Sequence, residues 1–240
     1  DIMRFIEAKD IIEILKESDI GEAIGQIKMS LNGTEVVIKQ NDIIGNALQE
    51  WLGQFLKEKD IYFRSAKGQT FPDFYLSEND NKNLCEMKTY YATRNPAFDV
   101  ANYFGYVDSL QEKPWRLDSD YIIFAYISDE EGNISIKDMW CKKVWEITGP
   151  SQDFALKCQR KKGQIYNIRP ANWKENSRGT LKPFSCKEEF VAALYKTHLS
   201  ESNQTKLSKA WLDKVIVEYE KYTGENMGQR VLQYVKGFNQ

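Results

Sequence analysis

Apolar residues recur along the chain at two spacings, and these spacings predict its helices and strands. Apolar positions three and four residues apart are typical of amphipathic helices, and they predict six of them: residues 4–17, 42–59, 99–111, 188–198, 207–222 and 227–236. Short apolar or alternating runs between turn residues are typical of strands, and they predict a hairpin at 26–40 around Asn32-Gly33 and strands at 71–76, 84–91, 121–127 and from 134 onward. This order of helices and strands indicates an α/β fold, a mixed sheet with helices on both sides.

Polar residues at three helix starts refine these boundaries. Asn41 or Asp42 is expected to cap the second helix, and Asp99 is expected to cap the third. Ser185 and Glu188 match the S-x-x-E pattern of a capping box, which predicts the start of the fourth helix. The last two helices are expected either to close the core or to form a dimer surface.

Composition narrows the compartment and the chemistry. Of 240 residues, 42% are hydrophobic and 28% are charged, as in ordinary soluble globular proteins, and no apolar run approaches the ~20 residues that span a membrane. The four cysteines (Cys85, Cys141, Cys158 and Cys186) are far apart and form no C-x-x-C, which argues against a zinc site or a disulfide framework and favours a cytoplasmic setting. Because His198 is the single histidine, acid–base chemistry would be left to carboxylates, lysine and metal.

Charged residues gather on two predicted strands that flank a turn rich in Ser, Asn and Asp. Successive side chains of a strand point to opposite faces, so Glu86 and Lys88 share one face. Cys85 and Met87 suit a core, which directs the charged pair outward, toward Asp73 on the neighbouring strand. Two carboxylates with a backbone carbonyl between them suit Mg²⁺, and the ammonium can hold or help deprotonate an attacking water.

Pro72-Asp73, followed after twelve residues by Glu86-Met87-Lys88, resembles the motif of the PD-(D/E)XK nucleases, which are typified by type II restriction endonucleases. The resemblance covers about residues 42–148 and implies a restriction-endonuclease-like mixed β-sheet core flanked by helices. It implies that Asp73 and Glu86 are Mg²⁺ ligands and that Lys88 positions the water. The implied reaction is hydrolysis of a phosphodiester that leaves a 5′-phosphate and a 3′-hydroxyl.

Other parts of the sequence affect how specifically the motif indicates a catalytic site. A second E-x-K, Glu7-Ala8-Lys9, has no Pro-Asp before it and no strand pattern, so E-x-K alone does not mark a site. Residues 71–91 could also form a solvated hairpin with a surface salt bridge. In the resembled family, a helix before the Pro-Asp strand often carries an acid that helps to hold metal; Glu50 lies at that place, although an acid beside a buried helical face explains it equally well.

Positive charge is concentrated between residues 157 and 187, where nine basic residues and one acidic residue give +8 in a chain of net charge -2. Such asymmetry is typical of a polyanion contact, although a basic run can also be a solvated face. A strand in this segment would set Arg169 beside Asn167, on the face of Ile165. Residues able to donate to phosphates or bases in this segment and in the loop after the E-x-K strand are Arg160, Lys161, Lys162, Asn167, Arg169, Tyr90, Thr93, Arg94 and Asn95.

Longer stretches extend the resemblance. FDVANYFGYVDSL, RLDSDYIIFAYI and the later IYNIRPANW are similar to small bacterial type II enzymes, of which the NgoBV-like group is one candidate. The resemblance implies double-stranded DNA as substrate, a homodimer matching palindromic sites, a cognate DNA methyltransferase as functional partner and a bacterial cytoplasmic location. Residues 1–240 are expected to form one nuclease domain with a catalytic core at about 42–148, a basic DNA-contacting segment at about 157–187 and C-terminal helices at about 188–236.

Three functions remain open from the sequence. The first is a sequence-specific restriction endonuclease, favoured because nearly 100 residues lie beyond the core sheet and can build a recognition surface. The second is a PD-(D/E)XK repair or junction-resolving nuclease. The third is a DNA-binding module without catalysis, which the intact Asp73, Glu86 and Lys88 argue against.

Overall fold

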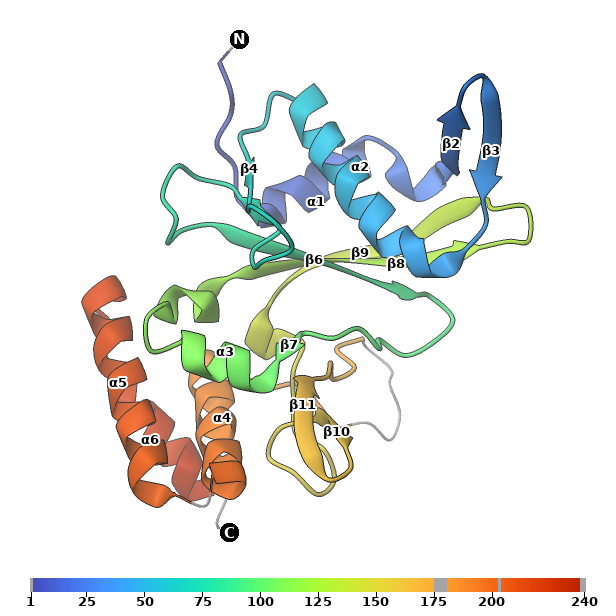
Figure 1. The fold of residues 1–240 in the computed structure, drawn as a ribbon. Helices are drawn as coiled ribbons and strands as arrows, with labels where there is room; N and C mark the ends of the chain where they lie inside the picture. The colour runs from blue at the N-terminus through green and yellow to red at the C-terminus, as the bar shows by residue number, and fades with distance from the viewer. Residues whose placement is uncertain (1, 175–180, 203, 238–240) are drawn as a thin grey trace. The chain divides into compact units, whose positions relative to one another are not determined.

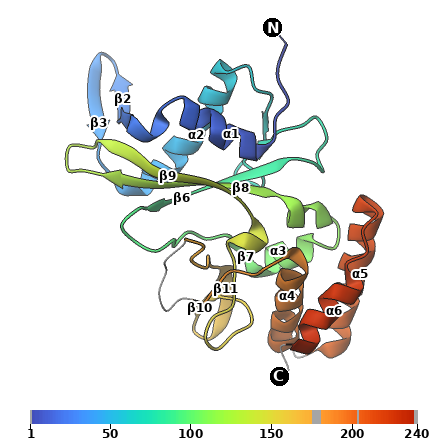
Figure 2. The ribbon, with the colours of Figure 1, turned by 180° about the vertical axis from the view of Figure 1, so that it is seen from behind.

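The described residues, 2–174, 181–202 and 204–237, form two compact units in this computed structural model (Figures 1 and 2). Unit 1 comprises Asp1–Asn95 and Ser119–Lys142, and unit 2 comprises Pro96–Asp118 and Lys143–Gln240. The mixed sheet and the helices confirm the expected α/β class. That all 240 residues form one domain stays a prediction.

Unit 1 is built on a mixed sheet of six strands in the order β1-β9-β8-β6-β5-β4. The strands are β1 (Ile24–Gly25), β4 (Arg64–Ser65), β5 (Phe74–Tyr75), β6 (Leu84–Tyr91), β8 (Asp120–Ser128) and β9 (Ile134–Lys143). The central strands β6 and β8 run parallel, whereas β5 runs antiparallel to β6. The strands predicted at 84–91, 121–127 and from 134 are therefore confirmed.

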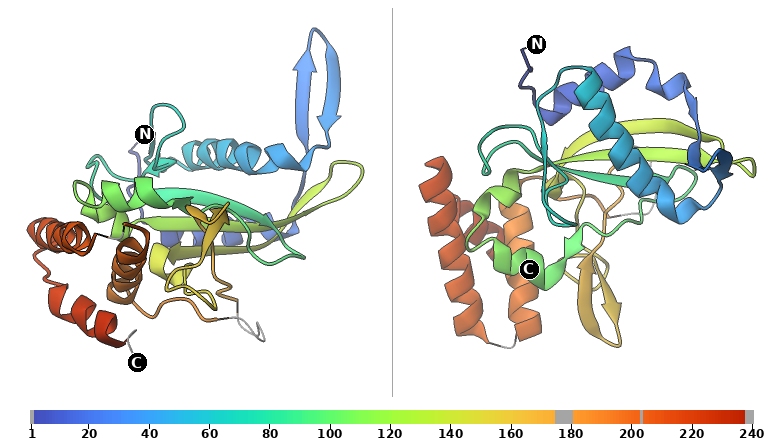
Figure 3. Two further views of the ribbon diagram at one scale, coloured as in Figure 1. Left: turned by 60° about the horizontal axis from the view of Figure 1, so that its bottom comes forward. Right: turned by 45° about the horizontal axis from the view of Figure 1, so that its top comes forward.

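Two helices, α1 (Ala8–Glu17) and α2 (Ile44–Glu58), pack on one face of this sheet (Figure 3). Their apolar side chains share one core with Cys85, Met87, Ile122 and Phe124 of the sheet. Cys85 and Met87 therefore face the core as predicted, and the alternation of the strand places Glu86 and Lys88 on the opposite face.

The helix starts in unit 1 differ from the prediction. Residues 4–7 are not helical, because Arg4 pairs with Ile61 in a bridge and Phe5 stacks on Tyr62 at 4.6 Å. Asn41 lies in the 3-10 turn η2 (Asn41–Ile43), and its side chain accepts a bond from Ser128 at 2.8 Å. Helix α2 has no side-chain cap bond, so the predicted cap at 41 or 42 is wrong.

A separate hairpin of two strands, β2 (Ile27–Leu31) and β3 (Thr34–Ile38), also belongs to unit 1. Asn32 and Gly33 at its tip have φ values of 48° and 81°. A type I′ turn requires positive φ at both central residues, and the prediction from the Asn-Gly pair is confirmed. A short 3-10 turn, η1 (Ile20–Glu22), and strand β1 come before it in the chain.

Unit 2 combines a small sheet with a group of helices. The sheet has the order β10-β11-β7, formed by β10 (Cys158–Lys161), β11 (Gln164–Ile168) and β7 (Ala101–Asn102). The helical elements are α3 (Tyr103–Ser109), η3 (Pro114–Asp118), η4 (Val144–Glu146), α4 (Lys187–Ser202), α5 (Thr205–Thr223) and α6 (Gly228–Gly237). Helix α4 packs against both α5 and α6, so the C-terminal helices contribute to a core within unit 2.

Two predicted caps in unit 2 are wrong for a reason of tertiary structure. Strand β7 occupies residues 101 and 102, so α3 begins at Tyr103, and its cap is Asn102, which accepts from the Gly105 N–H at 2.9 Å. The predicted capping box of Ser185 with Glu188 does not form, because the Ser185 hydroxyl donates to Glu189 at 2.7 Å and the Glu188 side chain is buried. None of the helices in the described part of the chain has the length and hydrophobicity that crossing a membrane requires.

Candidate active site

Asp73 is joined to β6 by two hydrogen bonds, one with Met87 and one with Glu86, that extend the pairing of β5 with β6. The Met87 N–H donates to Oδ2 of Asp73 at 2.8 Å, and the Asp73 N–H donates to Oε2 of Glu86 at 3.2 Å. Nζ of Lys88 lies 3.1 Å from Oε1 of Glu86. The structure thus brings together the three side chains that the motif predicted, in one cluster at the end of β5.

This cluster is not a solvated surface pair. The Glu86 side chain is 14% exposed and the Lys88 side chain is 19% exposed, whereas the pair Lys9–Glu7 in the second E-x-K is 70% and 56% exposed. The two copies of the three-residue pattern therefore differ sharply in environment. The lower exposure of Glu86 and Lys88 distinguishes the candidate site from the second E-x-K at Glu7–Lys9.

Burial also sets the electrostatics of the two carboxyls. Desolvation raises the pKa of Asp73, against the opposing effects of the Met87 N–H and the Lys88 ammonium. Desolvation raises the pKa of Glu86 as well; Lys88 opposes this shift, and the nearby Asp73 adds to it. A cation between two such carboxylates would favour their ionised forms.

The donor set of this cluster fits Mg²⁺. Across residues 2–174, 181–202 and 204–237, no group of three or more His, Cys, Asp or Glu side chains is placed to hold a metal ion. Mg²⁺ does not need such a group, because it is usually held by one or two carboxylates and completes its shell with waters and phosphate oxygens. Asp73 and Glu86 supply those two carboxylates.

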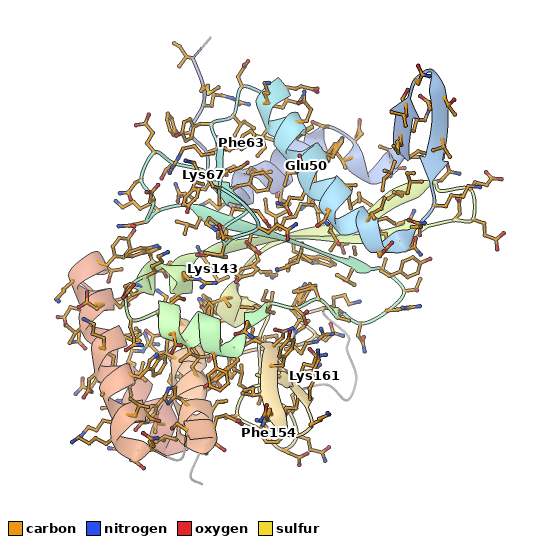
Figure 4. All side chains as sticks on the ribbon, viewed as in Figure 1. Glu50, Phe63, Lys67, Lys143, Phe154 and Lys161 are labelled. Atoms are coloured by element: carbon orange, nitrogen blue, oxygen red, sulfur yellow. The ribbon has the colours of Figure 1, made fainter. Side chains whose placement is uncertain are left out.

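Glu50 is exposed on α2, where it lines a cavity of about 260 Å³. The cavity is bordered by Gln49, Gly53, Phe63 and Phe74 among others, and Figure 4 labels Glu50 on the helix and Phe63 near it. Glu50 does not form a three-membered acidic cluster with the two carboxylates of the site in the described chain. Its role as an accessory ligand stays a prediction.

Gln49, the neighbour of Glu50, is the residue that the sequence interpretation missed. Its side-chain amide lies near enough to the Asp73 carboxyl to lower the pKa of that group, against the effect of burial. Gly45, Gln49 and Gly53 are four residues apart and share one helix face, and a Cβ at Gly45 would lie 3.1 Å from Oγ1 of Thr89 on β6. The spacing of the two glycines was the available signal that this face approaches the strands closely.

The predicted DNA contacts after β6 divide into buried and exposed residues. Tyr90 is 5% exposed and stacks on Trp140 with ring centroids 6.0 Å apart. Burial raises the pKa of Tyr90 to about 12. Thr93, Arg94 and Asn95 are exposed in the turn that follows the strand, so these three have the accessibility that a DNA contact needs.

The two predicted arginines of the basic segment pair with carboxylates inside unit 2. Arg160 lies 2.6 Å from Glu201, with both side chains at most 20% exposed. Arg169 lies 2.5 Å from Asp99 and also donates to the carbonyl of Ala97 at 2.6 Å. Both arginines therefore form ion pairs within unit 2, and any contact with DNA would come in addition to these pairs.

Lys161 and Lys162 are exposed at the turn between β10 and β11. Nζ of Lys161 lies 4.2 Å from the centroid of the Tyr166 ring, and Figure 4 labels this lysine on the hairpin. Asn167 is half-buried and donates to Gln159 at 3.4 Å. The two charged residues at 175–180, Glu175 and Arg178, lie outside the described residues.

The strand alternation predicted for this segment is wrong. Ile165 and Ile168 are both buried, although an odd and an even position should face opposite ways. The register of β10 and β11 shifts between Cys158 and Arg160, and this bulge turns both isoleucines inward. Strand β11 also ends at Ile168, so Arg169 does not share a strand face with Asn167.

Three comparisons place the chain among known proteins. Residues 5–237 match the family model of the NgoBV restriction endonuclease. The chain is 37% identical to the type II restriction enzyme NlaIV of Neisseria lactamica over 212 residues, which cover 88% of this chain and 87% of that protein. It is also 37% identical to the type II restriction enzyme NgoBV of Neisseria gonorrhoeae over 152 residues, which cover 62% of this chain and 86% of that protein.

A solved structure agrees with these sequence matches. The fold superposes on the NlaIV restriction endonuclease with a TM-score of 0.87 at 35% identity, covering 93% of this chain and 92% of the other. The resemblance to small bacterial type II enzymes of the NgoBV-like group is thereby confirmed. The chain belongs to the NgoBV restriction endonuclease family.

Proposed function

We propose that this protein is a type II restriction endonuclease that cleaves double-stranded DNA at a specific sequence in a Mg²⁺-dependent reaction. Its products would carry a 5′-phosphate and a 3′-hydroxyl. The observation that carries the proposal is the half-buried cluster of Asp73, Glu86 and Lys88 in a chain of this family.

Each member of the cluster has a distinct task in the proposed hydrolysis. Asp73 and Glu86 would hold Mg²⁺, which supplies charge neutralisation and polarisation at the scissile phosphate. Lys88, oriented by Oε1 of Glu86, would hold the attacking water and place positive charge beside the phosphoryl oxygens. The water oxygen bonds to phosphorus, the P–O3′ bond breaks, and the 3′ oxygen leaves as a hydroxyl after taking up a proton.

The proposal extends to the partners. Each chain carries one such cluster, whereas a duplex has two strands, so a homodimer would cut both strands in one encounter. The two Neisseria relatives are bacterial proteins, which supports a bacterial cytoplasmic setting and a cognate DNA methyltransferase as functional partner. Thr93, Arg94, Asn95, Lys161 and Lys162 are the exposed candidates for contacts with DNA.

Digestion of a plasmid with and without Mg²⁺ tests the proposed function. Discrete bands that need Mg²⁺, and whose ends DNA ligase rejoins without a kinase, are the expected result. A smear or cutting confined to branched DNA would instead indicate a repair or junction nuclease on the same core. Binding without any cutting would indicate a DNA-binding module and would refute the proposal.

A double variant, Lys161→Ala with Lys162→Ala, is expected to weaken binding of specific and random duplexes alike. Removing a lysine that touches a phosphate should also reduce the slope of log affinity against log salt by about one unit. Binding is measured in Ca²⁺ at several salt concentrations. The matched control is Lys206→Ala with Lys209→Ala, which removes the same charge from exposed positions on α5. If Lys161→Ala with Lys162→Ala leaves both the affinity and the salt slope unchanged, these two lysines form a solvated face.

Gln49→Ala is expected to raise the Mg²⁺ concentration that gives half-maximal cleavage while leaving DNA affinity in Ca²⁺ unchanged. The Gln49 amide lowers the pKa of Asp73 and so favours its ionised form, and its removal is expected to weaken the hold of that carboxylate on the ion. Gln54→Ala is the control, because Gln54 lines the same cavity but bonds Glu58 at 2.9 Å. An unchanged Mg²⁺ requirement in Gln49→Ala would show that Gln49 does not support Asp73 as a ligand.

A further inference from the structure

The β2–β3 hairpin has one wholly uncharged face, which we call the apolar face. Its residues come in three cross-strand pairs: Ile27 with Ile38, Met29 with Val36, and Leu31 with Thr34. Met29 is 52% exposed, Leu31 68% and Val36 52%. The opposite face carries Lys28, Ser30 and Glu35, and Nζ of Lys28 lies 3.1 Å from Oε1 of Glu35.

Such a face is unfavourable in an isolated chain. The hairpin is a two-stranded sheet to which no third strand is added in the described part of the chain, and Figures 1 and 3 show it rising from unit 1. Isolated two-stranded hairpins are marginally stable in water. Clustered exposed apolar side chains on a soluble protein usually mark a contact surface.

Contacts at the base of the hairpin fix its position on unit 1, and they leave the apolar face exposed. Gln26 donates to Asn133 in the β8–β9 turn at 2.9 Å. Gly132 in the same turn has a φ of +83°, and a Cβ there would lie 2.7 Å from Cγ1 of Val37, on the polar face. Ile27, at the foot of the apolar face, packs against the core. The hairpin is therefore anchored through its polar face and its base. The two outer pairs of the apolar face, Met29 with Val36 and Leu31 with Thr34, stay accessible to a partner.

We propose that the apolar face is where two copies of this chain associate; this rests on the proposed function, which needs a second active cluster for the second DNA strand. A two-fold axis through the face sets Met29 and Val36 of one copy against the same residues of the other, which is an isologous contact. The face carries no charge, so it meets itself without like-charge repulsion.

Other occupants fit the face less well. A nucleic acid or a membrane surface would require cations among the apolar residues, and the lysine of the hairpin, Lys28, lies on the opposite face. A different protein that recognises its partner through ion pairs would find no charged residue on this face. Self-association is the pairing that an uncharged, amphipathic ribbon favours.

Met29→Glu and Ser30→Glu test the proposal as a matched pair, because they place the same charge on adjacent residues of opposite faces. Sedimentation without DNA or Mg²⁺ at micromolar concentration is expected to give a dimer for the wild type and Ser30→Glu, and a monomer for Met29→Glu. Equal circular dichroism and melting of the two variants would exclude misfolding. A monomeric wild type, or a Met29→Glu dimer as stable as the wild type, would overturn the proposal.

Cleavage provides a second readout that separates this proposal from the proposed function. On supercoiled plasmid, Met29→Glu is expected to accumulate nicked circles at concentrations where Ser30→Glu yields linear DNA. If the wild type cuts no DNA, the proposed function fails, and sedimentation still decides the dimer surface. If the wild type cuts DNA while Met29→Glu stays dimeric, the surface fails and the function stands.

Discussion

Glu86→Gln is expected to reduce DNA cleavage by more than about 1,000-fold, equivalent to about 4 kcal/mol of activation free energy. The substitution keeps an oxygen to accept the Asp73 N–H, so the local fold is retained. It removes one of the two charges proposed to hold the ion, and it removes the charge that pairs with Lys88. DNA affinity measured in Ca²⁺ should change little, because the proposed phosphate contacts lie on other residues.

The chain supplies an internal control for this experiment. Glu7→Gln makes the same change in the second E-x-K, whose side chains are exposed. Its single-turnover rate of cleavage should equal that of the wild type. Retention of more than about a tenth of wild-type activity in Glu86→Gln, which corresponds to less than about 1.4 kcal/mol, would remove Glu86 from the proposed chemistry.

Lys88→Met is expected to lower the cleavage rate by about 10²–10⁴-fold, the range for removing a group that positions or transfers a proton. Methionine keeps much of the aliphatic volume and removes the ammonium. Because Asp73 and Glu86 remain, Mg²⁺ should still bind, as measured by calorimetric titration in the presence of DNA. Lys9→Met in the exposed copy is the control, and equal rates for the two variants would contradict the role of Lys88.

The central strands and the motif followed from the sequence because their signals are local. Alternation along residues 84–91 separates Glu86 from Cys85 and Met87, and the structure confirms that the latter two join the core. Asn32-Gly33 fixed its turn in the same way, through backbone conformations that few other pairs adopt. In these segments the local preference and the tertiary packing agree.

The parts that the sequence did not predict depend on distant partners. Arg169 reads as a free cation until Asp99, 70 residues away, is placed 2.5 Å from it. Asp99 itself precedes β7, whose pairing with β11 delays the start of α3 to Tyr103. Gln49 carries no charge to attract notice, and it acts on the pKa of Asp73 because α2 approaches β5 and β6 along a face with two glycines.

The most direct test of the catalytic site is to locate the metal ion itself. Crystals grown with Mn²⁺ in place of Mg²⁺ would reveal bound ions through anomalous scattering. We predict a peak coordinated by the carboxylates of Asp73 and Glu86, and its distance from the Glu50 carboxylate would decide the accessory role of that residue. A peak at another acidic cluster, with none at Asp73 and Glu86, would contradict the proposed site.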